Sequence, residues 1–380
     1  MQNRIPILGL VFFFVSVAPD NNRATTEESS IAEVKRLGRE VVRDEQAPGK
    51  PVVQVNLINT DVKDSTLAKL TGLTDLRRLY LGNTRITDEG LRNLMAFPKL
   101  EYLLLYTTGI TDNGLAHLKP LHRLKTLILW DTPISDMGLT HLKALTHLEE
   151  LDLSETKVSN AGLSNLEALK DLKRLTVSNT EIGDSGLSHL KGLQKLQTLY
   201  LNFTPISDAG LVHLKNLTDL RTLSINGTRV GDPGLQQLTG LKELRELGLR
   251  GTRITDQGLA NLSGMSRLDD LFLDSTAITG AGLVHLKGLT QLKSLHLRAS
   301  KVTDTGLQSL KELKSLKALY LRDTKITDKS IPSLSELNHL TELDLIGTDI
   351  TEKGLSQLRK ALPKLHFLWH SPDRSAEPMP

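Results

Sequence analysis

Residues 79–94 read LYLGNTRITDEGLRNL, and the phrase returns along the chain with most of its leucines unchanged. Residues 199–214 read LYLNFTPISDAGLVHL, and residues 319–334 read LYLRDTKITDKSIPSL. The Thr of this phrase recurs every 24 residues, with Ser300 in one turn, as Thr60, Thr84, Thr108, Thr132, Thr156, Thr180, Thr204, Thr228, Thr252, Thr276, Thr324 and Thr348. A fixed period of this length is typical of a solenoid, in which each repeat forms one structural unit.

The first half of each repeat has the pattern of a short strand. Leu79 and Leu81 alternate with variable neighbours, so they are expected to point into a core while Tyr80 points out of it. The column of Ile86 holds only Ile or Val. We expect the hydroxyl of the Thr column to bond the backbone of the turn that follows the strand, because Ser300 retains the hydroxyl and drops the methyl.

The second half of each repeat has the pattern of a short helix. Leu91, Leu94 and Phe97 are spaced by three, and Thr87 or Asp88 is the expected N-cap. A Gly recurs two residues after this Asp, although a helix-interior Gly costs about 1 kcal/mol. Close packing of neighbouring turns, or a first turn that is not helical, would explain it.

Together the columns predict an α/β solenoid. No single repeat can bury its leucines alone, so stacked repeats must share one core. Strands about 4.8 Å apart form a parallel sheet, and the wider helices make the stack curve into a horseshoe with the sheet on its concave face and short helices on its convex face. The predicted division is a signal peptide over 1–18, a polar linker over 19–30, an N-terminal cap of helix and turn over 31–52, an array of about 13–14 repeats over 53–370, and a disordered tail over 371–380.

The N-terminus has the features of an export signal. Arg4 precedes the uncharged apolar run IPILGLVFFFVSVA, which ends in a small-x-small pattern at Ala18. The run is shorter than the roughly 20 residues that span a bilayer. Pro19 disfavours cleavage after Ala18, so an uncleaved N-terminal anchor is the alternative to a cleaved signal.

Composition excludes several kinds of function. The net charge is only +3, which gives no reason to expect nucleic acid or an anionic membrane as partner. The absence of Cys excludes disulfides, thiolate metal sites and Cys nucleophiles. No nucleophile elbow, zinc-protease motif or phosphate-binding loop occurs, so neither catalysis nor a cofactor is expected. A recurring His in HLK triplets alternates with Asn, Gln and Ser in its column, which indicates a polar surface site rather than a metal site.

These motifs carry a resemblance. The pattern LxxLxLxxT with ITDxGLxxLxxL resembles the leucine-rich repeat family over residues 53–370, and within it the ribonuclease-inhibitor-like and cysteine-containing classes. The segment APGKPVVQVNL is similar to the entry segment of exported bacterial leucine-rich repeat proteins. Thr stands where the family usually has Asn or Cys. The resemblance implies a curved solenoid that binds proteins on its concave face.

Aromatic residues gather at outward-facing strand positions, and they supply the candidate site. Phe272 and Tyr320 lie there too, next to a mixed-charge column of Arg250, Asp274, Arg298 and Arg322. An exposed aromatic cluster is typical of a protein-binding surface, although packing between neighbouring strands is the alternative explanation. The predicted partner-binding residues, including an acidic rim, are Tyr80, Tyr102, Leu104, Tyr106, Ile128, Trp130, Glu150, Asp152, Tyr200 and Phe203.

The sequence therefore predicts a non-enzymatic binding scaffold for a protein ligand, exported to the periplasm, cell envelope or medium. Two alternatives stay open. A substrate receptor of a ubiquitin ligase, as in F-box proteins with similar repeats, needs a helical module of about 40–50 residues before the array, and residues 19–52 are too few. An envelope structural protein or adhesin would act through its surface alone.

Overall fold

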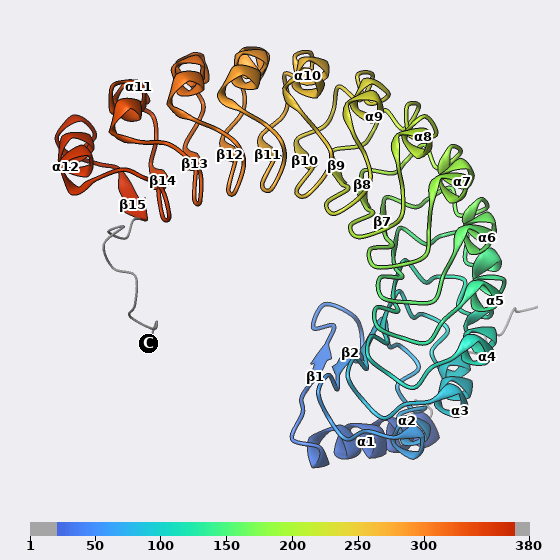
Figure 1. The fold of residues 1–380 in the computed structure, drawn as a ribbon. Coiled ribbons are helices and arrows are strands. Elements are labelled where there is room, and N and C mark those ends of the chain that lie inside the picture. The colour runs from blue at the N-terminus through green and yellow to red at the C-terminus, as the bar shows by residue number, and fades with distance from the viewer. Residues whose placement is uncertain (1–20, 369–380) are drawn as a thin grey trace, which may run out of the picture.

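The computed structural model describes residues 21–368 of the 380-residue chain. Its fifteen strands form one sheet in sequence order. Only the first pair, β1 and β2, is antiparallel, and every later pair is parallel. The strands line the inside of an open arc and the helices its outside (Figure 1). The predicted α/β solenoid with a concave parallel sheet is confirmed.

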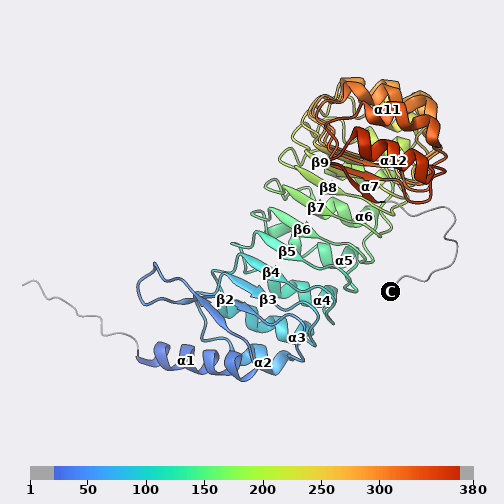
Figure 2. The same ribbon diagram turned by 90° about the vertical axis from the view of Figure 1, so that its left-hand side faces the viewer.

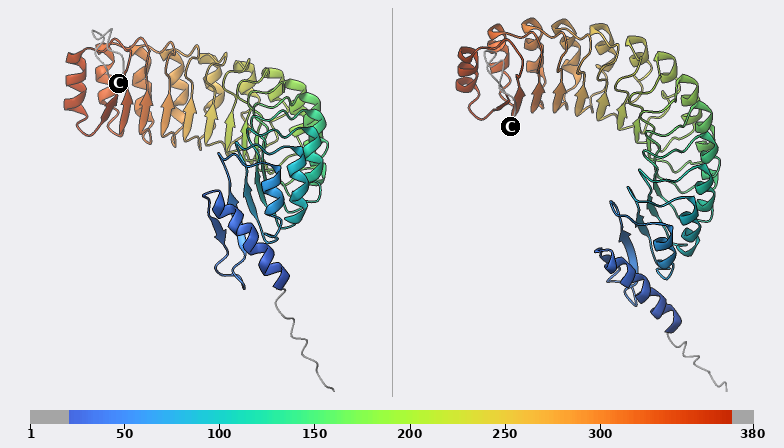
Figure 3. Two further views of the ribbon diagram at one scale, coloured as in Figure 1. Left: turned by 90° about the horizontal axis from the view of Figure 1, so that it is seen from below. Right: turned by 60° about the horizontal axis from the view of Figure 1, so that its bottom comes forward.

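The strands are short, and their register follows the 24-residue period. Leu79 pairs with Leu103, and Leu103 pairs with Leu127. The strands are β1 (Val41–Arg43), β2 (Val52–Asn56), β3 (Arg78–Tyr80), β4 (Tyr102–Leu104), β5 (Thr126–Ile128), β6 (Glu150–Asp152), β7 (Arg174–Thr176), β8 (Thr198–Tyr200), β9 (Thr222–Ser224), β10 (Glu246–Gly248), β11 (Asp270–Phe272), β12 (Ser294–His296), β13 (Ala318–Tyr320), β14 (Glu342–Asp344) and β15 (His366–Leu368). Figure 2 shows β2 to β9 stacked one above the next along the array. The two ends of the array do not lie in one plane (Figure 3).

The convex side consists of helical turns. The α-helices are α1 (Asn21–Arg36), α2 (Asp64–Lys69), α3 (Asp88–Leu91), α4 (Asp112–Leu115), α5 (Asp136–Leu139), α6 (Asn160–Leu163), α7 (Asp184–Leu187), α8 (Asp208–Leu211), α9 (Asp232–Gln236), α10 (Asp256–Leu259), α11 (Ile331–Ser335) and α12 (Glu352–Ala361). The 3-10 helices are η1 (Arg92–Ala96), η2 (Ala116–Leu118), η3 (Leu142–Ala144), η4 (Ser164–Leu166), η5 (Ser188–Leu190), η6 (Ala260–Leu262), η7 (Gly280–Gly288), η8 (Asp304–Glu312) and η9 (Asp328–Ser330). The leucine spacing of three matches a 3-10 helix, which has three residues per turn.

The core is a continuous column of Leu, Ile and Val. Leu79, Leu81, Ile86, Leu91 and Leu94 are all fully buried, and the equivalent residues of the neighbouring repeats cover them. Burying a Leu side chain contributes roughly 1.5–3 kcal/mol, so no repeat is stable without its neighbours.

The Thr column closes the turn after each strand. Each Thr hydroxyl, and that of Ser300, donates to the backbone carbonyl three residues earlier at 2.5–2.7 Å, in all thirteen turns. The expected role of the hydroxyl is confirmed. The residue before the Thr always has a positive φ, as in Asn83 at 52° and Phe203 at 56°. Gly and Asn adopt this left-handed conformation most readily, yet the column also holds Thr107, Glu155 and Ala299, so the turn imposes the conformation on other residues as well.

The Asp column joins each repeat to the next one. The carboxylate of Asp88 accepts bonds from the backbone N–H and the hydroxyl of Thr111, the residue that precedes the next helix. Asn160 plays the same part with a bond to Gly183, whereas Gly280 has no side chain to make this contact. A Cβ on Gly114 would collide with the carboxylate of Asp88, so close packing of neighbouring turns explains the recurrent Gly.

The N-terminal cap begins earlier than the sequence indicated. Residues 21–30, predicted as part of a polar linker, belong to α1. The Ser30 hydroxyl donates to the carbonyl of Lys69 at 2.8 Å, and Val34 is fully buried against the first repeat. Polar composition was misleading here because α1 has only a narrow buried face. The segment predicted as helix and turn also contains a strand, because Val41–Arg43 form β1.

The far end of the array is closed by α12 and β15. Phe367 pairs in register with Leu343 and packs against the core. Three parts of the sequence lie outside the described residues: the predicted signal peptide (1–18), Trp369, and the predicted tail (371–380).

Candidate functional site

The concave face is built from three side-chain columns. Within each strand, the first and third residues point away from the core, and the residue two positions beyond the strand lies on the same side. In β4 these are Tyr102, Leu104 and Tyr106, which are all half-buried between the equivalent residues of β3 and β5. A ligand approaching this face therefore meets rows of side chains that run along the stack.

Six predicted site residues form one contiguous surface, which we call the aromatic patch: Tyr80, Tyr102, Leu104, Tyr106, Ile128 and Trp130. Tyr80, Leu104 and Ile128 are direct neighbours in the register of β3, β4 and β5. The rings of Tyr106 and Trp130 lie 5.8 Å apart at 39°. The guanidinium of Arg78 stands 4.8 Å over the Tyr102 ring. Ring pairs at such distances are favourable, and Arg–aromatic contacts add to them.

The patch is partly exposed and partly supported from beneath. Trp130 is 38% exposed, whereas the other five members are half-buried. The Tyr106 ring lies directly over Gly82, in space that any larger residue would need. Because Gly82 has no side chain, the Tyr106 ring can lie in this space, and a larger residue at position 82 would displace it.

The predicted acidic rim is less acidic than its composition suggests. Glu150 forms an ion pair with Arg174, with Oε1 and Nε 3.2 Å apart. The carboxylate of Asp152 accepts the backbone N–H of Ser154 at 2.8 Å, and burial raises the pKa of Asp152. Both residues adjoin the patch at β6, where Glu150 is paired with a cation and Asp152 is half-buried.

Two predicted site residues are remote from the patch. Tyr200 lies on β8, three strands beyond β5, where burial raises its pKa. Phe203 follows β8 in the left-handed turn position, with its ring over Gly227 and 64% of its surface exposed. The structure therefore places them together with each other but not with Tyr106 and Trp130.

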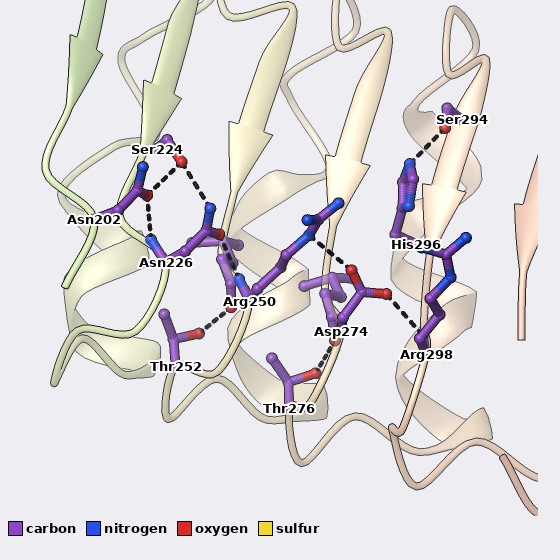
Figure 4. Close-up of polar contacts among 12 residues, drawn as sticks. Asn202, Ser224, Asn226, Arg250, Thr252, Asp274, Thr276, Ser294, His296 and Arg298 are labelled. Atoms are coloured by element: carbon purple, nitrogen blue, oxygen red, sulfur yellow. Dashed lines mark hydrogen bonds and ion pairs between the residues drawn. The ribbon is translucent and has the colours of Figure 1, made fainter. Parts of the chain in front are cut away.

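A second cluster occupies the C-terminal half of the concave face. Arg250 Nε lies 2.7 Å from Asp274 Oδ2, and the other carboxylate oxygen of Asp274 accepts the backbone N–H of Arg298 (Figure 4). His296 bonds Ser294 at 2.9 Å beside them. The shared column of arginines was visible in the sequence, but the part played by His296 was not. Its signal is the alignment of Phe272, His296 and Tyr320 at the same repeat position.

An asparagine ladder leads into this cluster. Asn202 Oδ1 accepts the backbone N–H of Asn226 and the hydroxyl of Ser224, and Asn226 Oδ1 accepts the backbone N–H of Arg250 (Figure 4). These amide oxygens satisfy backbone donors just after the strands, so the ladder holds the turns together and is not free for a ligand.

The His column lies on the convex side. His189 Nδ1 lies 2.6 Å from Glu167 Oε1, and burial lowers the pKa of His141. Within residues 21–368, no three His, Asp or Glu side chains are placed to hold a metal ion together. No helix in that range is long and apolar enough to span a membrane.

The repeat architecture defines a leucine-rich repeat solenoid, and comparison with known proteins agrees. Residues 89–369 match the family described as "Leucine-rich repeat region", and residues 72–95 match "Leucine Rich repeat". The chain belongs to the leucine-rich repeat family. A comparison with curated protein sequences finds no match.

Several solved structures share the fold. An internalin from Listeria monocytogenes is 25% identical with a TM-score of 0.70, and the match covers 91% of this chain and 94% of the internalin. A leucine-rich repeat protein of Leptospira interrogans is 18% identical with a TM-score of 0.55, covering 82% of this chain and 95% of that one. A TDR receptor is 16% identical with a TM-score of 0.58, covering 84% and 56%. The latter two show the fold alone.

Proposed function

We propose that this protein is a non-enzymatic, exported scaffold that binds a partner protein on its concave sheet. The carrying observation is the aromatic patch, a contiguous set of aromatic and aliphatic side chains over β3, β4 and β5. Binding energy at protein interfaces concentrates in such residues, especially Trp and Tyr in well-packed surroundings. The Tyr106–Trp130 pair, 5.8 Å between ring centres, is the proposed centre of the interface.

Two further observations support the proposal. The backbone of the face is already ordered, because Tyr80 and Tyr102 lie on paired strands and the carbonyls of Tyr106 and Trp130 accept backbone N–H groups of the preceding repeat at 2.8 and 2.9 Å. A preordered backbone lowers the entropy lost on binding. The similarity to the Listeria internalin covers 91% of this chain, and we infer from it that the chain is a bacterial protein of the same general kind. The apolar leader of residues 5–18 is the sequence feature behind the proposed export.

Affinity capture with purified protein tests the proposal. The wild-type chain and the double variant Tyr106→Ala/Trp130→Ala are immobilised and exposed to a cell-envelope extract of the source organism. Met95→Ala/Met137→Ala is the matched control, because both methionines are large, apolar and highly exposed, at 73% and 68%, but lie on the convex side. A partner retained by the wild type and the control but lost by the aromatic variant supports the proposal. A partner retained equally by all three contradicts it.

A further inference from the structure

Three parallel columns of unlike chemistry run along the concave face from β10 to β14, and we call them the striped surface. The first residues of three of these five strands supply carboxylates, with Ser294 and Ala318 between the second and the third of them. The third residues of the three middle strands supply rings. The positions two residues beyond the strands supply three arginines, with the buried Asp274 between the first and the second. The acidic column is Glu246, Asp270 and Glu342, the aromatic column is Phe272, His296 and Tyr320, and the basic column is Arg250, Arg298 and Arg322. The acidic and basic columns are four residues apart, at most about 13 Å in extended chain.

The aromatic column is a continuous stack. The His296 ring lies 4.3 Å from Phe272 on one side and 4.3 Å from Tyr320 on the other. Burial, together with the charges of Arg250 and Arg298, lowers the pKa of His296 to about 3, so this ring is neutral at physiological pH. The stack therefore provides an uncharged, flat strip between two charged ones.

The arginines of the basic column are held in place from below. Asp344 is fully buried, and its Oδ2 contacts Arg298 at 3.2 Å and Arg322 at 3.5 Å. The guanidiniums of Arg250 and Arg298 also stand 4.4 and 4.5 Å over the rings of Phe272 and Tyr320. Because the carboxylates are buried and the arginines are 36–43% exposed, a ligand meets guanidinium groups rather than neutral pairs.

The basic column also has unused donors. Three arginines share two carboxylates, Asp274 and Asp344, which leaves one positive charge in excess. The buried Nε atoms of Arg250 and Arg322 face Asp274 Oδ2 at 2.7 Å and Asp344 Oδ2 at 3.5 Å, so the donors left for a ligand are on the outer nitrogens of these guanidiniums. A guanidinium offers five N–H donors in a fixed fork, so several remain available for a carboxylate.

Two carboxylates of the acidic column have no ion-pair partner among the described residues, although the charge of Arg250 acts on Glu246 and that of Lys293 acts on Asp270. Glu246 and Asp270 are neighbours in register, and neither forms an ion pair with another described residue. Burial raises the pKa of both carboxyls, and for Glu246 the charge of Asp270 adds to the effect. Two desolvated like charges side by side are unfavourable, and a cation from a partner would relieve them.

We propose that the striped surface binds a mixed-charge peptide segment of a partner protein, which lies across the strands with acidic side chains toward the basic column and basic side chains toward the acidic column. An extended peptide projects alternate side chains to opposite edges, so a sequence of alternating charge presents one sign to each column. A nucleic acid fits poorly, because its phosphates would face the acidic column. This inference rests on the proposed binding function but uses residues remote from the aromatic patch.

Two labelled octapeptides of identical composition test the proposal by fluorescence anisotropy at low ionic strength. One alternates glutamate and lysine, and the other has four glutamates followed by four lysines. An extended octapeptide spans about 26 Å, enough to cover the roughly 19 Å from β10 to β14. We expect the alternating peptide to bind the full chain at least threefold more tightly than the block peptide, and added salt to remove the difference.

A triple variant locates the binding. Arg298→Gln/Arg322→Gln/Asp344→Asn removes the charges without stranding a buried carboxylate, and the amide oxygen introduced by Asp344→Asn can still accept the backbone N–H of Ile346, which the Asp344 carboxylate accepts in the wild type. The matched control, Arg85→Gln/Arg92→Gln/Asp61→Asn, makes the same charge change at an exposed ion pair and a helix surface outside the striped surface. The preference for the alternating peptide should vanish in the first variant and persist in the second.

Three outcomes would overturn the inference: equal binding of the two peptides, an undiminished preference in the first triple variant, or displacement of the alternating peptide by a single-stranded oligonucleotide at equal concentration. Failure here with a positive result for Tyr106→Ala/Trp130→Ala in affinity capture would reject the striped surface alone. Far-ultraviolet circular dichroism and thermal melting of each variant establish that it is folded before binding is measured.

Discussion

Asp88 and Thr111 are 23 residues apart and belong to successive repeats, yet the carboxylate of Asp88 accepts both the backbone N–H of Thr111, at 2.7 Å, and its hydroxyl. The pair satisfies a backbone donor in the residue preceding the next helix, where the chain has no helical partner for it. Repeated along the array, this contact sets the spacing on the convex side as strand pairing does on the concave side.

Asp112→Ala should destabilise the array. The carboxylate of Asp112 accepts two bonds from Ser135, and their loss leaves a half-buried backbone N–H without a partner, at a cost of about 1–3 kcal/mol. Asp112→Asn should cost much less, because Asn160 fills the same role naturally. Urea unfolding followed by circular dichroism measures both. Equal midpoints for wild type and Asp112→Ala would show that the contact contributes nothing.

Thr156→Val should also lower stability by about 1–3 kcal/mol. The Thr156 hydroxyl donates to the Leu153 carbonyl at 2.6 Å in a buried turn, and Val keeps the shape but not the donor. Thr156→Ser is the control, since Ser300 makes the same bond in its own repeat. Because repeat proteins unfold locally, hydrogen exchange of the amides after β6 should report the change more directly than a global melt. A Val variant as stable as wild type would remove the hydroxyl from the explanation of this column.

Much of the fold could be predicted because each repeat carries the same residue types at the same positions as the repeats before and after it. The inward leucines, the Thr turn and the strand order follow from the period alone, since each column has a single environment. The partner of Asp88 could not be predicted, because N-capping within a repeat and bonding between repeats require the same residue type at the same place. The positive φ of the residue before each Thr could not be predicted from the sequence, because that column holds Asn, Asp and Gly but also Phe203.

The candidate site was less predictable than the core. Outward columns carry no periodic signal, so the sequence placed Tyr200 and Phe203 with the patch although three strands separate them from it. The sequence also did not predict the ion pair between Glu150 and Arg174, because their contact depends on how neighbouring strands are paired. The start of α1 was placed about ten residues too late because a cap touches only one repeat and thus shows no period.

Gly82→Ala should weaken partner binding without truncating any aromatic residue. The added methyl would collide with the Tyr106 ring, which can move because it ends a flexible side chain, so global stability should fall by less than about 1 kcal/mol. The Tyr106–Trp130 contact would be lost, and the emission of Trp130, one of two tryptophans, should change. Gly240→Ala is the control, since the nearest atom to its new methyl would be 3.7 Å away. Unchanged emission together with unchanged partner affinity would show that the ring position does not matter.

The stability of the C-terminal half should decrease in mild acid because of His296. Its pKa is about 3 in the folded chain, against about 6.5 for an unperturbed His. Between these values the unfolded chain binds a proton that the folded chain does not, so the stabilisation present above pH 6.5 is lost progressively as the pH falls toward 3. His296→Gln removes this proton and should lose less stability than wild type between pH 7.5 and 4.5, measured as the shift in urea midpoint. The half-buried Glu246 and Asp270 and the buried Asp274 have raised pKa values, and they act in the opposite direction but are common to both proteins. His122→Gln, at an exposed loop position, should keep the wild-type pH dependence. If His296→Gln keeps it as well, the protonation of His296 is not what weakens the fold in acid.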